Sequence, residues 1–144
     1  MKITVYNQQK NLPLSKSSAR NAIAAALKFL KMDWEQITLY FVTEKRISSL
    51  HEQFFDDPTS TDCITFPIDD RHGEIFVCPA TAIAYAEKRK QDPYWEATLY
   101  IVHALLHLAG YDDLEEKAKR SMRKKEKSCM GHLSKLGLLI SQKP

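Results

Sequence analysis

Apolar and polar side chains alternate over four short segments of the chain, which is the pattern of strands that bury one face. This alternation predicts strands at residues 2–6, 37–41, 63–66 and 74–78. The last two flank the segment Asp69-Asp70-Arg71-His72-Gly73, which suits a hairpin turn or a wider loop. We therefore expect at least one antiparallel pair of strands.

Five other segments place apolar residues at helical spacing. The expected helices cover residues 15–31, 43–55, a stretch starting at 79, 93–109 and 113–136. In the second, Ile47, Leu50 and Phe54 should share the inward face, and in the last, Leu114 should begin a narrow apolar stripe. Together these elements predict an α+β fold with a mixed sheet of about four strands flanked by about five helices.

The composition agrees with one compact unit. A chain of 144 residues with 44% hydrophobic side chains is expected to form a single domain, residues 1–144, around one core. No apolar stretch approaches the ~18 residues that cross a bilayer, and the first residues lack a secretory signal, so we expect a cytoplasmic location. Three widely spaced cysteines predict free, buried thiols rather than disulfides.

The positive charge is concentrated near the end of the chain. The net charge is only +3, yet residues 115–135 carry eight basic and three acidic side chains. Any attraction for a polyanion should therefore be local to this segment.

A pair of histidines carries the main chemical signal. His103 and His107 are four residues apart in an otherwise apolar helix, a spacing that lets two imidazoles reach one metal ion. Gly110 can then turn the chain so that Asp113 returns a carboxylate toward the same ion. His51, His72 and His132 lack such a context and are expected on the surface or in loops. The sequence therefore predicts a metal site on a helix and the turn that follows it.

The full spacing is HxxxHxxGxxD, which is that of the long zinc motif of metzincin proteases. Those proteases place a glutamate after the first histidine as general base, whereas this chain has Ala104, so peptide hydrolysis by that mechanism is not expected. Three protein ligands with one open position describe a catalytic zinc site, in which the ion activates water. An alternative role for Asp113 is to cap the last helix, since Asp113 with Glu116, or Asp112 with Glu115, has the spacing of a capping box.

The stretch Val102–Asp112, VHALLHLAGYD, resembles the HGxLHLxGYDH signature of the YbeY family of bacterial endoribonucleases. Residues 58–66 (PTSTDCITF) and 73–78 (GEIFVC) are similar to two further family segments. Met122 and Glu126 stand where the family's last helix commonly has Met and Glu. The resemblance covers roughly residues 35–126. It implies a mixed sheet flanked by helices, a zinc-class ion held by three histidines, and cleavage of single-stranded RNA during ribosomal RNA maturation.

The chain departs from the family pattern at two positions. Asp113 stands in place of the third histidine, which keeps an oxygen ligand but changes its length, charge and preferred ion. Phe54 and Phe55 are the nearest counterparts of a family arginine that would hold a phosphate. Other cations could replace it, or could simply face solvent. The RNA-binding candidates are Arg71, Lys88, Arg89, Arg120 and Lys124, the last two within the basic set Lys117, Lys119, Arg120, Arg123, Lys124, Lys125 and Lys127.

Two hypotheses from different classes follow. The first is a metal-dependent, single-strand-specific endoribonuclease (a hydrolase) that holds one zinc or similar divalent ion through His103, His107 and Asp113. It would act on ribosomal RNA and ribosomal particles in rRNA processing and ribosome quality control, without DNA or a membrane as partner. The second is a catalytically degenerate RNA- or ribosome-associated binding protein. Metal-dependent hydrolysis of another substrate is a third possibility, and the oligomeric state is not predicted.

Overall fold

The computed structural model of the chain describes residues 1–59 and 61–143. Ser60, inside the family-like segment 58–66, and Pro144 lie outside the described residues. The strands are β1 (Lys2–Asn7), β2 (Gln36–Phe41), β3 (Cys63–Pro67) and β4 (His72–Val77). They form one sheet in the order β1-β2-β4-β3.

The sheet is mixed, as the sequence predicts. β1 pairs with β2 and β2 with β4 in parallel, whereas β3 and β4 form an antiparallel pair in which Cys63 lies opposite Val77. The Asp69 side chain closes the connection by accepting hydrogen bonds from the backbone N–H groups of Arg71 and His72, at 2.8 and 2.9 Å. The expected hairpin is therefore confirmed.

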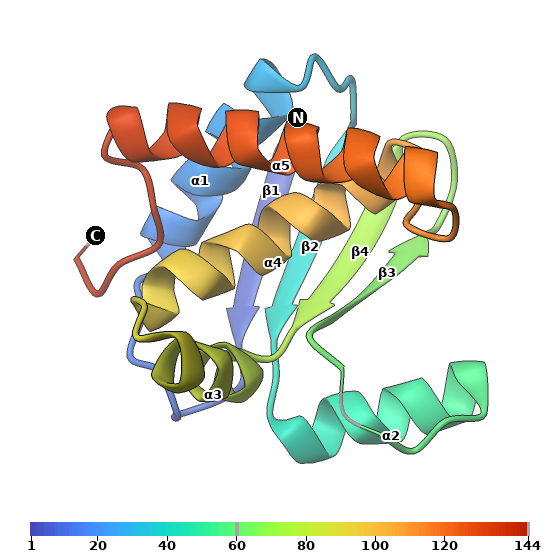
Figure 1. The fold of residues 1–144 in the computed structure, drawn as a ribbon, viewed down its shortest axis with the longest axis vertical. Helices are drawn as coiled ribbons and strands as arrows, with labels where there is room; N and C mark the ends of the chain where they lie inside the picture. Colours follow the sequence, from blue (N-terminus) through green and yellow to red (C-terminus); the bar gives the residue numbers. More distant parts are fainter. Residues whose placement is uncertain (60, 144) are drawn as a thin grey trace.

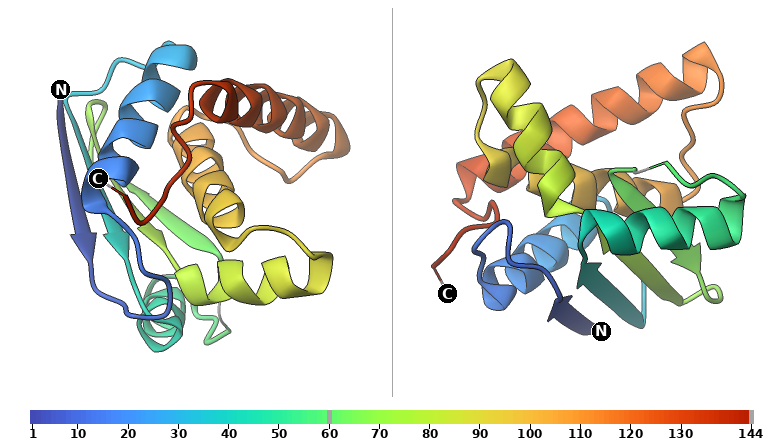
Figure 2. Two further views of the ribbon diagram at one scale, coloured as in Figure 1. Left: turned by 90° about the vertical axis from the view of Figure 1, so that its left-hand side faces the viewer. Right: turned by 90° about the horizontal axis from the view of Figure 1, so that it is seen from below.

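Five helices complete the fold, which confirms the predicted α+β class. They are α1 (Lys16–Phe29), α2 (Glu44–Phe55), α3 (Pro79–Arg89), α4 (Pro93–Leu108) and α5 (Glu116–Lys135). Helices α1 and α4 pack on one face of the sheet, and α5 crosses over them as an outer layer (Figures 1 and 2). Helix α2 lies at one end of the sheet, where its Ile47 and Leu50 pack with Ile64 and Phe76.

Three of the helices begin next to N-cap residues that can be recognised in the sequence. The side chains of Ser15, Thr43 and Asp92 each accept a hydrogen bond from a backbone N–H in the first turn of α1, α2 and α4. Pro93 occupies the first turn of α4, where its missing N–H costs nothing. Among the described residues, none of these helices is both long and apolar enough to span a bilayer.

Two expected core positions are wrong. The last helix begins at Glu116 instead of Asp113, so Leu114 lies before it and is 88% exposed. Phe54, near the end of α2, packs against Phe66 of β3 at a ring separation of 4.9 Å, but it is still 55% exposed and is not a core residue. Cys78 and Cys129 are buried as expected, whereas Cys63 is only half-buried.

Helix α4 is the centre of the core. Its residues Ile101, Val102, Ala104, Leu105 and Leu106 are almost completely buried between the sheet and the outer helices. The side of α4 that carries His103 and His107 is only half-buried. Packing of the apolar side therefore fixes how the histidine side is presented.

We expect Leu105→Ala to lower the free energy of unfolding by about 2–5 kcal/mol, because it leaves a cavity in this core. Leu114→Ala removes the same atoms from an exposed site and should change it by less than about 0.5 kcal/mol. Urea denaturation of metal-free protein measures both. Equal effects of the two variants would contradict the assigned core.

Candidate metal centre

The two histidines of α4 direct the same ring nitrogen toward one another. The Nε2 atoms of His103 and His107 are 3.0 Å apart, and the ring planes are nearly perpendicular. Two nitrogens bound to one tetrahedral ion at 2.0–2.1 Å each lie about 3.3–3.4 Å apart. A shift of a few tenths of an ångström therefore converts this arrangement into a chelating pair.

The other ring nitrogen of each histidine, Nδ1, forms a hydrogen bond. Nδ1 of His103 donates to the Glu126 carboxylate on α5, and Nδ1 of His107 donates to the Tyr111 carbonyl at 3.1 Å. Because both partners are acceptors, the protons sit on Nδ1, and each Nε2 presents a lone pair. Two facing lone pairs repel unless a cation or a shared proton lies between them. Carboxylate or carbonyl partners of this kind typically orient metal-binding histidines.

Asp113 completes a group of three possible ligands. One ligand atom from each of His103, His107 and Asp113 lies within 4.8 Å of the others. The turn that brings Asp113 back uses Gly110 in the left-handed region, at φ 98°, and is closed by the Tyr111 N–H donating to the Leu106 carbonyl at 3.0 Å. Helix α5 has Glu115 as its N-cap, so Asp113 is not the capping residue.

The electrostatics favour positive charge at this point. Burial by itself lowers the pKa of His103, but the hydrogen bond and charge of Glu126, with the charges of Asp62 and Asp113, raise it above its ordinary value. The same negative environment attracts a divalent cation. Protons and metal should therefore compete for His103 as the pH falls.

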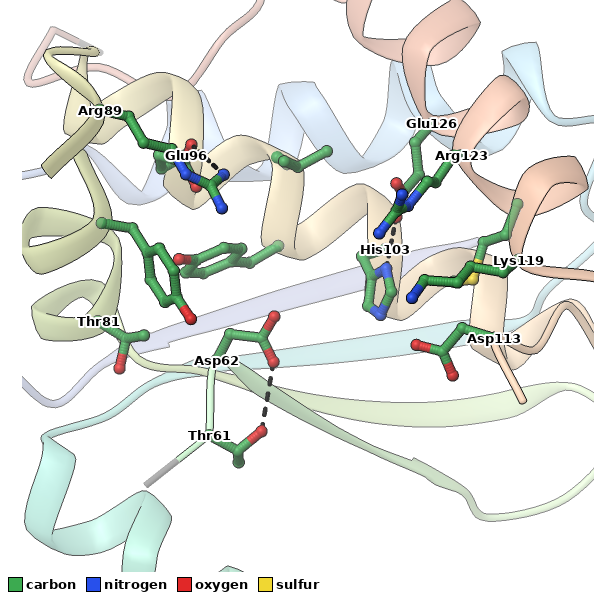
Figure 3. A pocket seen from close by; sticks show the side chains of 14 residues that line it. Thr61, Asp62, Thr81, Arg89, Glu96, His103, Asp113, Lys119, Arg123 and Glu126 are labelled. Atoms are coloured by element: carbon green, nitrogen blue, oxygen red, sulfur yellow. Dashed lines mark hydrogen bonds and ion pairs between the residues drawn. The ribbon is translucent and has the colours of Figure 1, made fainter. Parts of the chain in front are cut away.

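Two adjoining cavities open onto the histidines. The larger, of about 440 Å³, reaches from Arg89 and Glu96 on one side to His103 and Asp113 on the other, with Asp62 between them (Figure 3). The smaller, of about 350 Å³, is lined by Asp62, Asp113 and both His103 and His107. The three possible ligands thus lie where a substrate can reach them.

The smaller cavity brings two further side chains beside the histidines. His51 on α2 lines it, with Nδ1 bonded to the Thr59 carbonyl at 2.9 Å. Cys63 lines it too, and burial together with Asp62 raises the pKa of its thiol well above the ordinary value. Of the other histidines, His72 begins β4 and His132 on α5 packs against Phe29 at a ring separation of 4.6 Å.

The predicted RNA-binding residues fall in different places. Of the five, only Arg89 lines either cavity. Arg71 pairs with Asp33 and Glu35 at 3.5 and 3.6 Å, outside both cavities, and Lys88 on α3 is exposed.

On α5 the cavity is lined by Lys119 and Arg123 instead of Arg120 and Lys124. Neighbouring helix positions point about 100° apart, so a one-residue difference selects another face. Lys119 and Arg123, one turn apart, are thus the cations of α5 that face the candidate metal centre (Figure 3).

Sequence reasoning missed three acidic residues of the site. Glu126 is 23 residues from His103, and only the family resemblance pointed to it. Asp62, which accepts from the Cys63 N–H at 2.8 Å, stands in a family-like segment but was not assigned a role. Glu96 could have been noticed from the sequence, because it is a charged residue in a helix that is otherwise largely apolar, and the structure shows that it is buried.

Comparisons with known proteins agree with the sequence resemblance. The family model described as Endoribonuclease YbeY matches residues 4–134. Endoribonuclease YbeY of Protochlamydia amoebophila (strain UWE25) is 43% identical over 145 residues, which cover 96% of this chain and 97% of the relative. Endoribonuclease YbeY of Chlamydia felis (strain Fe/C-56) is 36% identical over 152 residues, covering 98% and 96%.

A solved structure is similar as well. The solution structure of TM1509 from Thermotoga maritima superposes with a TM-score of 0.65 at 27% sequence identity, covering 89% of this chain and 86% of that protein. The overall fold is therefore similar to an experimentally determined one.

We expect Glu126→Gln to weaken zinc binding by about 10- to 100-fold, because the neutral amide holds and polarises His103 less well. Glu116→Gln removes an exposed carboxylate from the first turn of the same helix and should leave the affinity unchanged. Competition with a chromophoric chelator measures both. If Glu126→Gln binds zinc as tightly as the parent protein, Glu126 has no part in the site.

Proposed function

Because this chain belongs to the YbeY endoribonuclease family, we propose that it is a metal-dependent endoribonuclease specific for single-stranded RNA. Its substrates are ribosomal RNA and ribosomal particles, in rRNA maturation and ribosome quality control, and it works in the cytoplasm as a single domain of residues 1–144. The observation that carries the metal-dependent part is the pair of Nε2 atoms that face each other at 3.0 Å beside the Asp113 carboxylate.

The donor set fits zinc. Two imidazoles and one carboxylate, with room for a fourth ligand, form the set used by several catalytic zinc sites. His103, His107 and Asp113 would hold one zinc or similar divalent ion. When bound, such an ion supplies Lewis acidity and lowers the pKa of water.

Other residues of the chain orient the two imidazole rings and bind the substrate. Glu126 and the Tyr111 carbonyl fix the orientation of both rings, and Lys119 and Arg123 offer cations to the phosphates of the substrate. The histidines are recessed in cavities, so a phosphodiester reaches them most easily on a strand whose bases are free to separate. This accessibility favours single strands over a rigid duplex.

The exposed Phe55 stands where the resemblance places an arginine. Phe55 lines the smaller cavity, whereas Lys119 and Arg123 offer positive charge in the larger one, and we propose that they take over the binding of phosphate. The binding-protein hypothesis is the competing outcome, since it requires RNA binding without metal-dependent cleavage.

We expect chelation to abolish cleavage of an unstructured RNA and added zinc to restore it. His107→Ala should lose bound metal and cleavage together, because it removes one of the two imidazoles. Metal analysis and a gel-based cleavage assay on the same preparation check this, with His132→Ala as the control outside the site. Cleavage that survives in metal-free protein contradicts the proposal, and RNA binding without any metal-dependent cleavage favours the binding-protein hypothesis.

Paired variants of α5 test the assigned phosphate contacts. Combining Lys119→Ala with Arg123→Ala should weaken RNA binding and reduce the slope of log affinity against log salt by about 0.7 for each lost contact. Arg120→Ala with Lys124→Ala removes the same charge from positions outside the cavity and should have a smaller effect. Fluorescence anisotropy of metal-free protein with a short RNA at several salt concentrations gives both slopes. Equal slopes for the two double variants would show that α5 attracts RNA only through its overall charge.

A further inference from the structure

Glu96 is a buried acid that the proposed metal chemistry does not use. It lies in the first turn of α4, it is only 2% exposed, and its Oε1 atom has no hydrogen-bond partner among the described residues. The Arg89 guanidinium forms a long ion pair with Oε1, at 3.9 Å, which is beyond hydrogen-bond distance. A buried carboxylate oxygen that accepts no hydrogen bond is costly, so a bound molecule that donates to Oε1 would be stabilised there.

Glu96 lies at the opposite end of the larger cavity from the metal centre. It precedes His103 by seven residues on the same helix, which corresponds to about 10 Å along the helix axis. Figure 3 shows Arg89 and Glu96 at one end of the cavity and His103, Lys119 and Asp113 at the other. A molecule that reaches both ends must therefore be elongated, with different chemistry at each end.

The walls near Glu96 suit a flat ring. Tyr85 and Tyr100 line this part of the cavity, and the Arg89 guanidinium lies 5.1 Å from the centre of the Tyr85 ring. Aromatic faces of this kind stack with nucleobases. The Arg89 side chain is 59% exposed, so it can shift to admit a base while staying beside Glu96.

The donor pattern selects one base. A carboxylate is acceptor-only, so it is complementary to an edge with two adjacent N–H donors. Guanine presents N1–H and N2–H together on its Watson–Crick edge, whereas adenine, cytosine and uracil each place an acceptor beside their donor. Arg89, next to Glu96, is a donor that matches the guanine O6 acceptor.

We propose that the Arg89–Glu96 end of the cavity is a guanine-binding subsite, in which Glu96 accepts from N1–H and N2–H and Arg89 donates to O6. This inference rests on the proposed function for the identity of the substrate as RNA. Because the cavity continues from Glu96 to His103, the ribose and phosphate of a guanosine bound there can extend toward His103, so the subsite would select RNA with a guanosine next to the cleaved bond.

The test is nucleotide binding to the complete, metal-free protein, so that it is independent of cleavage. Titration with GMP, AMP, CMP and UMP in the presence of a chelator, followed by NMR, should give tightest binding for GMP by about 5- to 150-fold, the discrimination expected of one bidentate base contact. IMP lacks the N2 amino group and should bind between GMP and the others. Shifted resonances should include Tyr85 and Tyr100.

Glu96→Gln should abolish the preference for GMP, because an amide presents only one acceptor oxygen. Glu87→Gln, on the exposed surface of α3, is the matched control and should retain the preference. Equal binding of the four nucleotides by the unaltered protein, or an unchanged preference in Glu96→Gln, would overturn the proposal. The ranking in the unaltered protein remains decisive even if Glu96→Gln fails to fold. A failed guanine subsite also leaves metal-dependent cleavage intact, so the two proposals are separable.

Discussion

Two imidazole nitrogens that face each other at 3.0 Å, each with a lone pair, repel unless positive charge lies between them. This pair exists because the opposite nitrogens are committed to Glu126 and to the Tyr111 carbonyl. Without those partners the rings could rotate and the repulsion would disappear. The negative charges of Asp62 and Asp113 nearby favour the binding of a cation between the two nitrogens.

Helix α4 holds the two histidines in this arrangement because its apolar side is packed in the core and the helix cannot rotate. Leu105 and its apolar neighbours are held between the sheet and α5, so the helix cannot turn to relieve the histidines. The same helix carries the metal centre at one end and, at the other, Glu96, whose Oε1 accepts no hydrogen bond among the described residues. Packing energy from the core thus keeps two unfavourable polar features in place, and both are positioned to bind something outside the chain.

Features that depend on neighbouring residues were predictable from the sequence. Strand alternation, the capping residues and the spacing of His103 and His107 are local, and all the strands and helices they predicted are present. The contribution of α5 was less predictable. The spacing of Asp113 and Glu116 mimics a capping box, so the expected helix began three residues early, and periodicity alone did not identify which cations face the cavity. Glu126 and Asp62 reach the site through tertiary packing of distant segments, for which a single sequence carries no direct signal.

The most direct test is the crystal structure of the zinc-loaded protein with data collected at the zinc absorption edge. We expect one anomalous peak bonded to Nε2 of His103 and Nε2 of His107 at about 2.0–2.1 Å, and to an Asp113 carboxylate oxygen at about 2.0–2.2 Å. Glu126 should still accept a hydrogen bond from Nδ1 of His103. No peak among these residues, with the two rings turned away from each other, would rule out this metal centre.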